Sequence, residues 1–496
     1  MFFRELSRPA TTSQPKSPVV LRGTEAHGTV VSPLPSSAAD RSNQSVLAGL
    51  AIVSPLVIVS GSRVHYDGCM NRNPQSSSSS RRYENSRRSS PAIPRELLEQ
   101  RPLCPEDNEP LPQVEVRLGG ALWHPFVYRK QIGQISRSAM PGDLVQLNST
   151  SGEIIGFGLF NPEAEIAVRV LRAGQRRPDA LWWSERLAQA VALRRETLHL
   201  DEVTQAYRVI HAEADGLPGL VVDRFGDVLV AECFSLGMYQ RAEAILSQLD
   251  VLTGTKHGVL RAAPMSQDHE GFSATPYGSA EVPAKTTVVE HGTRFRINFA
   301  GGHKTGFYCD QRDNRKQLAQ YCSGKSVLDL CCYTGGFALQ AKRLGQAAEV
   351  TGVELDEETV VLARENANLN QVKINFVQAE VFGYMRDMLR NKKRFDVVVL
   401  DPPKLIRSRA EIEEGRHKYF DLNRLAMQLV NPGGILLTCS CSGLLDMAEF
   451  NKIVNAAPEV GRRGQILART GAAPDHPIST NCPESEYLKT IWVRMD

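Results

Sequence analysis

Short apolar runs alternate with helical patterns in the C-terminal part of the chain, from about Asn298 onward. Five of these runs have the length and the aliphatic content of buried strands: Ser326–Leu330, Glu349–Leu355, Ile374–Glu380, Phe395–Asp401 and Gly434–Ser440. Apolar strands that alternate with helices are typical of a parallel sheet covered on both faces. The pattern therefore predicts an α/β domain over residues 296–496.

A different pattern precedes this domain. Between Val114 and Arg172, short apolar runs are separated by Gly and Pro turns, which predicts a small β barrel over residues 112–175. Trp182–Leu200 has the periodicity of an amphipathic helix, and two predicted strands meet at a tight turn over Phe225–Asp227. We therefore expect a central α+β domain over residues 176–295.

The first 110 residues are rich in Ser, Pro and Arg and include the serine run Ser76–Ser80. Such a composition cannot bury enough surface to offset chain entropy, so we expect residues 1–111 to form a disordered extension. Its one long apolar run, Val46–Val59, is too short to cross a bilayer and contains Pro55. We therefore expect no membrane anchor.

The chain has 496 residues, of which 42% are hydrophobic and 23% charged, as in ordinary soluble proteins of two to three domains. The first 110 residues hold 13 basic and 10 acidic side chains, which accounts for the whole net charge of +3. Any site for a polyanion in the remainder must therefore be a local patch. The ten cysteines form no CxxC pair, so we expect a reducing, cytoplasmic setting and no bound metal.

Acidic residues end three successive predicted strands, at Asp329, Glu354 and Glu380. Glu354 follows Asp329 by 25 residues, the spacing of one strand–helix–strand unit whose acid accepts hydrogen bonds from ribose hydroxyls. Glu380 is placed to reach an adenine amino group. Three such acids at one sheet edge predict a site for an adenosyl cofactor.

The loop after the first strand continues with Cys331, Cys332, Tyr333, Thr334, Gly335 and Gly336. Paired glycines at a strand-to-helix turn let a ligand approach the backbone closely. Both NAD and S-adenosylmethionine (SAM) could use such a crevice. The fourth strand favours SAM, because it ends in a rigid loop of the kind that methyltransferases place around the acceptor base: Asp401, Pro402, Pro403 and Lys404.

The fifth strand leads to Cys441, next to Asp401 if the strand order is 3-2-1-4-5. Carbon 5 of cytosine is too weak a nucleophile to accept a methyl group unaided, whereas a thiolate added at carbon 6 activates it. We therefore expect Cys441 to be a nucleophile and Asp401 to stabilise charge on the ring. Cys439 is a competing candidate, since it points the same way along the strand.

Long motifs in a fixed order resemble the bacterial large-subunit ribosomal RNA methyltransferase I family, which forms 5-methylcytosine in 23S RNA. The resemblance runs from about Val114 to Asp496 and rests on these segments: Glu213–Arg224, His303–Arg315, Asp329–Phe337, Asp401–Lys404, Thr438–Gly443 and Asp475–Pro477. It implies a PUA-like RNA-binding barrel, a central domain and a class I SAM-dependent methyltransferase domain, Rossmann-like, with a mostly parallel seven-stranded sheet.

The resemblance also implies that four residues before the first strand line the cofactor pocket: Phe307, Asp310, Gln311 and Arg312. Glu354 and Glu380 depart from the family pattern, because relatives commonly carry Asp there. Other RNA 5-methylcytosine enzymes carry a second cysteine beside the fourth-strand acid, and this chain has none. The base that removes the proton from carbon 5 is therefore unassigned.

Aromatic and basic residues that could bind single-stranded RNA lie early in the barrel: Trp123, His124, Arg129 and Lys130. They could equally be a barrel core with surface cations. Lys404 heads a second basic stretch that continues to Lys418. The expected partner is 23S rRNA or a ribosomal particle, and a homodimer is possible. Two rival functions are guanine N-methylation in rRNA and a non-enzymatic role in ribosome assembly.

Overall fold

The computed structural model describes residues 98–106, 108–274, 277–279, 281–299 and 306–496. Most of the expected disordered extension, residues 1–97, lies outside this range. The last part of that prediction is wrong, because the described residues between 98 and 111 pack against the protein. Leu103 is buried, and the backbone N–H of Arg101 donates to the carbonyl of Gln240 at 2.6 Å. Composition missed this segment because a few apolar contacts to a distant surface suffice to order it.

A six-stranded sheet forms the barrel, in the order β2-β6-β5-β4-β1-β3. Its interior is aliphatic, with Val114, Val127, Val145 and Leu147 all fully buried. The elements are β1 (Gln113–Val116), β2 (Phe126–Tyr128), η2 (Arg129–Gln131), β3 (Ile132–Ile135), β4 (Leu144–Asn148), β5 (Ile154–Phe160) and β6 (Ile166–Ala173).

The central region is a five-stranded sheet, ordered β11-β10-β9-β8-β7, with a separate hairpin of β12 and β13. Its strands are β7 (Ala206–His211), β8 (Leu220–Phe225), β9 (Val228–Cys233), β10 (His257–Ala262), β11 (Tyr277–Gly278), β12 (Lys285–Glu290) and β13 (Thr293–Asn298). Its helices are α1 (Ala180–Ala192), η3 (Leu193–Thr197), η4 (Leu200–Glu202), η5 (Ala212–Asp215), α2 (Leu236–Tyr239), α3 (Ala242–Thr253) and α4 (Pro264–Glu270).

Two predictions for the central region need correction. The expected boundary at 295/296 falls inside β13, because the pairing of β12 with β13 continues to Asn298 opposite Lys285. The turn at His291 and Gly292 joins the two strands of this hairpin, with both residues at positive φ. The expected helix over Trp182–Leu200 is α-helical only to Ala192 and continues as the short π-helix η3.

Seven strands form the C-terminal sheet, in the order β16-β15-β14-β17-β18-β20-β19. The first five are parallel, and β20 runs antiparallel to β18 and to β19. The strands are β14 (Ser326–Leu330), β15 (Glu349–Glu354), β16 (Asn375–Gln378), β17 (Phe395–Leu400), β18 (Val430–Ser440), β19 (Gly464–Thr470) and β20 (Lys489–Met495).

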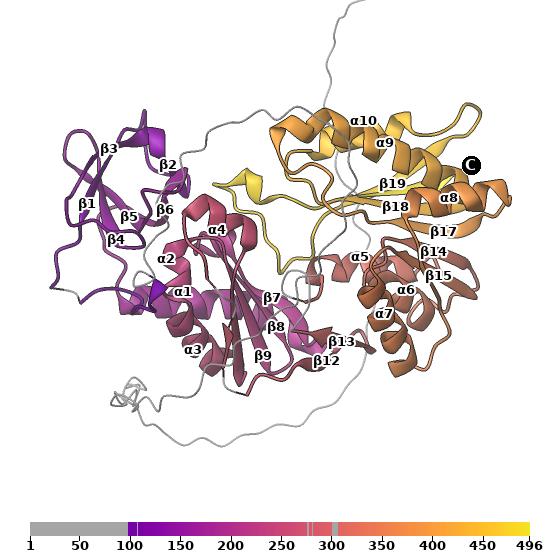
Figure 1. Cartoon of the computed structure of the whole chain (residues 1–496), viewed down its shortest axis with the longest axis horizontal. Helices are drawn as coiled ribbons and strands as arrows, with labels where there is room; N and C mark the ends of the chain where they lie inside the picture. The colour runs from indigo at the N-terminus through magenta and orange to yellow at the C-terminus, as the bar shows by residue number, and fades with distance from the viewer. Residues whose placement is uncertain (1–97, 107, 275–276, 280, 300–305) are drawn as a thin grey trace, which may run out of the picture. The chain divides into compact units, whose positions relative to one another are not determined.

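Helices cover both faces of this sheet (Figure 1). Adjacent residues of β14 point to opposite faces, so that Val327 joins the core with α5, α6 and α7, and Leu328 joins the core with α8, α9 and α10. The helices are η6 (Cys309–Gln311), α5 (Arg312–Ala319), α6 (Gly336–Arg343), α7 (Glu357–Leu369), α8 (Val381–Arg390), η7 (Arg409–Glu411), α9 (Ile412–Leu429), α10 (Met447–Ala456) and η8 (Pro483–Ser485).

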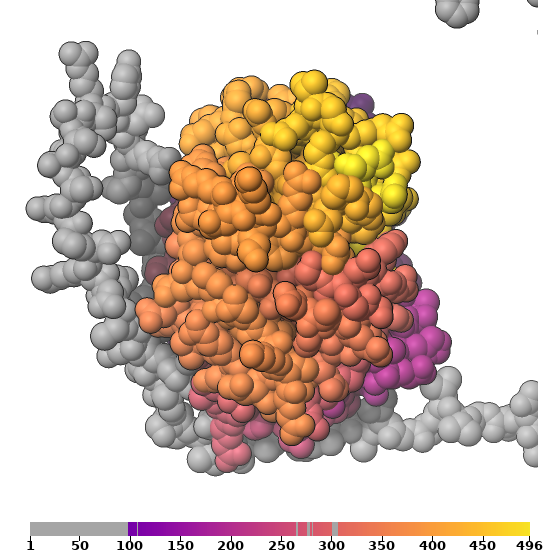
Figure 2. Space-filling model, turned by 90° about the vertical axis from the view of Figure 1, so that its right-hand side faces the viewer, coloured from indigo at the N-terminus to yellow at the C-terminus, as the bar shows by residue number. Residues whose placement is uncertain are grey.

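The residues of this sheet and its helices, coloured orange to yellow, make up most of the face shown in Figure 2. Among the described residues, no helix combines the length and the apolar character needed to cross a membrane.

Candidate active site

The carboxyl ends of the parallel strands bring the predicted acids and thiols to one edge of the sheet. Asp329 lies in β14 and Glu354 ends β15, while Asp401 directly follows β17 and Cys441 directly follows β18. Open α/β sheets bind ligands at this edge, where the connections diverge. This edge of the sheet is therefore the candidate active site.

The loop from β14 to α6 has an unusual backbone. Cys331 and Tyr333 adopt positive φ values of 61° and 50°, and Gly335 has φ 83°. A side chain at Gly335 would also collide with the ring of Phe376, because its Cβ would lie 2.9 Å from Cζ. Non-glycine residues with positive φ are strained and cluster at functional sites. The sequence therefore builds a tight, strained turn at the end of β14, of the kind found at ligand sites.

Glu354 ties this loop to β15. Its carboxylate accepts hydrogen bonds from the backbone N–H of Tyr333 at 2.9 Å and of Leu355 at 2.8 Å. The side chain is only partly buried. An acid held in this way is a preorganised acceptor at the end of the second strand, as the spacing in the sequence predicts.

Asp329 is fully buried at the centre of the edge. Its Oδ2 accepts from the backbone N–H of Ala338 at 2.9 Å, whereas its Oδ1 has no hydrogen-bond partner among the described residues. Burial, with a smaller contribution from the nearby charges of Asp401 and Glu354, raises the pKa of Asp329 to about 8. A buried acceptor without a donor is uncommon and marks a place where a ligand could donate.

Glu380 caps the N-terminus of α8. Its two carboxylate oxygens accept from the backbone N–H groups of Phe382 at 2.8 Å and Gly383 at 2.7 Å. The side chain is exposed beyond β16. The structure thus gives this predicted cofactor residue a helix-capping contact that its position in the sequence had not suggested.

The segment before β14 approaches the edge through Gln311. Its Nε2 donates to Oδ2 of Asp401 at 3.0 Å and lies 3.4 Å from Sγ of Cys439. Phe307 is buried against Phe295, with ring centroids 4.9 Å apart. Of the four residues predicted here, Gln311 reaches the edge, whereas Phe307 packs in the core of the domain.

The other two predicted residues of this segment make buried polar contacts. Arg312 forms two hydrogen bonds with the carboxylate of Asp475, at 2.8 and 3.1 Å. Asp310 accepts a hydrogen bond from the hydroxyl of Tyr487 at 2.6 Å. These contacts anchor the segment to the end of the chain rather than present it to solvent.

The two thiols of β18 and its continuation differ in access. Cys439 is fully buried, its Sγ lies 3.6 Å from the hydroxyl of Thr490, and burial raises its pKa well above the ordinary value. Cys441 is half-buried, and its Sγ lies 4.0 Å from the carbonyl of Pro402 in the loop that begins at Asp401. Cys441 is therefore the thiol that a substrate could reach at this edge.

Comparison with known proteins shows which family of proteins this chain resembles. Residues 220–457 match the family model of the S-adenosylmethionine-dependent methyltransferases, and residues 123–173 match that of the PUA-like domain. The ribosomal RNA large subunit methyltransferase I of Photobacterium profundum is 37% identical over 374 residues, which cover 74% of this chain and 94% of that protein. The protein of the same name from Tolumonas auensis is 38% identical over 381 residues, covering 75% and 95%.

The chain belongs to the ribosomal RNA large subunit methyltransferase I family. The resemblance found in the motifs is confirmed, and so are the PUA-like domain, the SAM-dependent methyltransferase fold and SAM as cofactor. A solved methyltransferase in complex with SAH shares the fold with a TM-score of 0.65, at 18% identity, and covers 77% of this chain and 99% of its own.

In this member of the methyltransferase I family, the aromatic and basic residues of the barrel divide into two groups. Trp123 is 61% exposed, and Lys130 is exposed as well. Arg129 is exposed but donates hydrogen bonds to the carbonyls of Glu163 and Ala164. Trp123 and Lys130 are thus available to a ligand, whereas Arg129 also ties η2 to the loop between β5 and β6.

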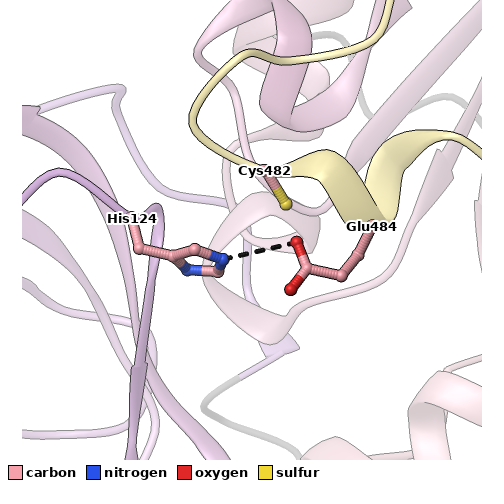
Figure 3. Close-up of side chains that lie close together, drawn as sticks. All are labelled: His124, Cys482 and Glu484. Carbon is pink, nitrogen blue, oxygen red and sulfur yellow. Dashed lines mark ion pairs between the residues drawn. The ribbon is translucent and has the colours of Figure 1, made fainter. Parts of the chain in front are cut away.

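His124 faces the C-terminal segment rather than solvent (Figure 3). Its Nε2 lies 3.5 Å from a carboxylate oxygen of Glu484, and Cys482 is close to both. Its Nδ1 accepts the backbone N–H of Phe126 at 3.1 Å, so in the neutral ring the proton is on Nε2. A metal ion on Nε2 would require the proton on Nδ1, against that N–H donor. The geometry therefore fits a contact between the barrel and residues 482–484 better than a metal centre.

The C-terminal part of the second basic stretch is paired with carboxylates. Arg416 contacts Glu413 and Glu449, and Lys418 lies 2.7 Å from Glu414. Lys404 is exposed beside the site. Intramolecular pairing of this kind reduces the positive potential that the stretch can offer to RNA.

Sequence reasoning missed one charged residue at this edge. Lys489 begins β20 and is paired opposite Ser440, so it lies beside the end of β18. An isolated cation directly before an apolar strand, Thr490–Val493, was the only signal in the sequence.

Proposed function

We propose that this chain transfers a methyl group to carbon 5 of a cytosine in 23S rRNA, through a covalent adduct with Cys441 and with help from Asp401. Its relatives are named for methylation of large-subunit ribosomal RNA, which supports rRNA as the substrate. The observation that carries the finer proposal is a half-buried thiol, Cys441, beside the loop that starts at Asp401.

The thiolate of Cys441 would add to carbon 6 of the ring, and the displaced electron pair would make carbon 5 an enamine-type nucleophile. Asp401 would stabilise the charge that develops at the ring edge, with its carboxylate oriented by the hydrogen bond from Gln311. SAM supplies an electrophilic methyl group. Loss of the proton from carbon 5 then expels the thiolate and restores the aromatic ring.

The residues at the edge suit the adenosyl cofactor. Glu354 offers an oriented carboxylate to the ribose, and the positive-φ turn through Gly335 lets the loop fold closely over the end of the strand. The unsatisfied oxygen of Asp329 offers an acceptor to a cationic group such as the amine of SAM. We assign these three residues to cofactor binding, with Tyr333, Thr334 and Gly336 from the same loop.

The RNA would contact the exposed side chains outside the crevice. Trp123 provides a surface on which a base could stack, and Lys130 and Lys404 provide charge for phosphates.

The proposal is tested by incubating the protein with labelled SAM and bacterial 23S rRNA, and then identifying the labelled nucleoside. We expect 5-methylcytidine from the wild type and a loss of about a thousandfold or more for Cys441→Ala. Cys439→Ser removes the competing thiol and should keep activity, and Cys322→Ala is a control for loss of a buried thiol far from the edge.

Each other outcome has a defined meaning. Label in guanine, with full activity of Cys441→Ala, would replace the proposal with guanine N-methylation. No transfer to any RNA by the folded protein would favour the assembly-factor alternative. RNA containing 5-fluorocytidine adds a second test, because it should trap a covalent complex with the wild type and none with Cys441→Ala.

A further inference from the structure

Lys489 is a buried cation at the edge that holds Cys441. Lys489 is only 1% exposed, and it is the first residue of β20, which pairs with β18. Its Nζ donates to the carbonyl of Ser442 at 2.6 Å and to the carbonyl of Tyr487 at 2.7 Å. Ser442 directly follows Cys441, so the ammonium group fastens the turn on which the thiol lies.

The hydrogen bonds of Lys489 leave its charge without a counter-ion. Both acceptors of Lys489 in the described part of the chain are neutral carbonyl oxygens. A buried ammonium group without an ion pair is expensive, because it has lost its hydration. Burial accordingly lowers the pKa of Lys489 to about 8, and the negative form of Cys441 is the strongest of the influences that oppose this lowering.

The same attraction acts on the thiol. An ammonium group that is stabilised by a thiolate stabilises that thiolate in return, since the interaction is mutual. Other titratable groups surround the pair, and each must be considered in a pH experiment: Asp401, Cys439, Tyr308, Tyr419, Lys404, Asp446 and Glu486. Lys489 and Lys404 are the two cations among these groups. Lys489 is buried and fixed by two hydrogen bonds, whereas Lys404 is exposed.

We propose that Lys489 is a positioning residue that holds the Cys441 turn in place and stabilises the thiolate of Cys441. The thiol proton leaves to solvent or to another base, and below its own pKa of about 8 the ammonium group keeps its three protons. This role rests on the proposed function of Cys441 as nucleophile, but it can be measured without methyl transfer.

The experiment follows alkylation of Cys441 by iodoacetamide as a function of pH, with the modified peptide quantified by mass spectrometry. Lys489→Met removes the charge and the hydrogen bonds, Lys489→Gln keeps an N–H donor without the charge, and Lys489→Arg keeps the charge. We expect the midpoint to rise by about one pH unit in the Met and Gln variants, so that alkylation at pH 7 slows about tenfold. The Arg variant should restore most of the reactivity.

A matched control is Lys342→Met. Lys342 also donates to two backbone carbonyls, those of Ala347 and Ala348, both at 2.8 Å, and it lies outside the candidate site. This variant should leave the midpoint for Cys441 unchanged. Circular dichroism and the melting temperature of every variant establish that it is folded.

Two results would overturn the proposal. One is an unchanged midpoint in folded Lys489→Met. The other is wild-type behaviour of Lys489→Gln, because the side chain would then act only as a tether. If Lys489→Met does not fold, the Gln and Arg variants decide alone. Failure of the proposed function is separate, because it would appear as retained methyl transfer in Cys441→Ala whatever the alkylation result.

Discussion

The two halves of the catalytic edge are held together in different ways. In the half formed by β14, β15 and β16, carboxylates accept hydrogen bonds from nearby backbone N–H groups, as Glu380 does from Phe382 and Gly383. In the half formed by β17, β18 and β20, side chains distant in sequence hold Asp401 and the turn that carries Cys441. Gln311 and Asp401 are 90 positions apart, and Lys489 and Ser442 are 47 apart.

The half formed by β14, β15 and β16 therefore depends on local contacts, whereas the half formed by β17, β18 and β20 depends on contacts across the whole fold. Backbone N–H groups next to an acid position it as soon as the strand and the helix form. The contacts of Gln311 and Lys489 exist only once α5 and β20 have docked on the sheet. Substitutions should therefore have different effects in the two halves.

The largest expected effect is on the support beneath Gln311. Asp475→Ala would leave the buried guanidinium of Arg312 without its buried carboxylate partner, with only the contact of its Nε to the exposed Asp313 remaining. Loss of a buried partner typically costs about 3–5 kcal/mol. Asp356→Ala, which removes the N-cap of α7 in the local half, should cost about 1 kcal/mol. Urea unfolding measures both. Equal losses for the two variants would remove the distinction drawn between the halves.

The second prediction concerns Asp329 and pH. Because its pKa is raised from 3.8 to about 8, the folded protein keeps the proton that the unfolded chain releases between these values. Wild-type stability should therefore fall as pH rises through this window, and Asp329→Asn should not show that fall. We expect the variant to gain on the order of 4 kcal/mol relative to wild type between pH 5 and pH 8.5.

Thermal or urea unfolding at the two pH values tests this prediction. Asp356→Asn serves as a control, since that carboxylate is exposed. A difference between wild type and Asp329→Asn that is independent of pH would mean that Asp329 ionises normally in the folded protein.

Substitution of Glu354 tests the half formed by β14, β15 and β16 through the binding of SAM. Glu354→Gln keeps one acceptor oxygen but loses the charge and one backbone hydrogen bond, so we expect SAM affinity to fall by about tenfold to a hundredfold. Isothermal titration calorimetry gives the dissociation constant. Glu357→Gln, an exposed position in the first turn of α7, is the control and should bind SAM as the wild type does.

The smallest expected effect is on Gln311. Gln311→Ala removes the donor that orients Asp401, and we expect kcat to fall about tenfold with little change in SAM affinity. Gln317→Ala, on the adjoining helix α5, should leave kcat unchanged. If Gln311→Ala instead weakens SAM binding and spares kcat, Gln311 belongs functionally to the crevice.

The contrast also explains what the sequence could and could not predict. The family, the SAM-dependent fold and the PUA-like domain follow from motifs and from strand periodicity, and they are confirmed. Asp329, Glu354 and Asp401 could be placed at one edge because parallel strands end there.

Contacts between distant segments left little trace in the sequence. Nothing near Lys489 indicates that its ammonium group reaches Ser442, and nothing near His124 indicates Glu484. The packing of residues 98–111 and the continuation of β13 past residue 295 are of the same kind. Each depends on a partner that only the folded chain brings close.

The position of β20 between β18 and β19 has a consequence for synthesis of the protein. Until Lys489–Met495 have left the ribosome, β18 presents an unpaired apolar edge, and β19 has no neighbour to join. Such an edge can pair with other chains. A chain truncated just before this strand would therefore lose two strands from the sheet at once and be prone to aggregation, with the turn that carries Cys441 unsupported.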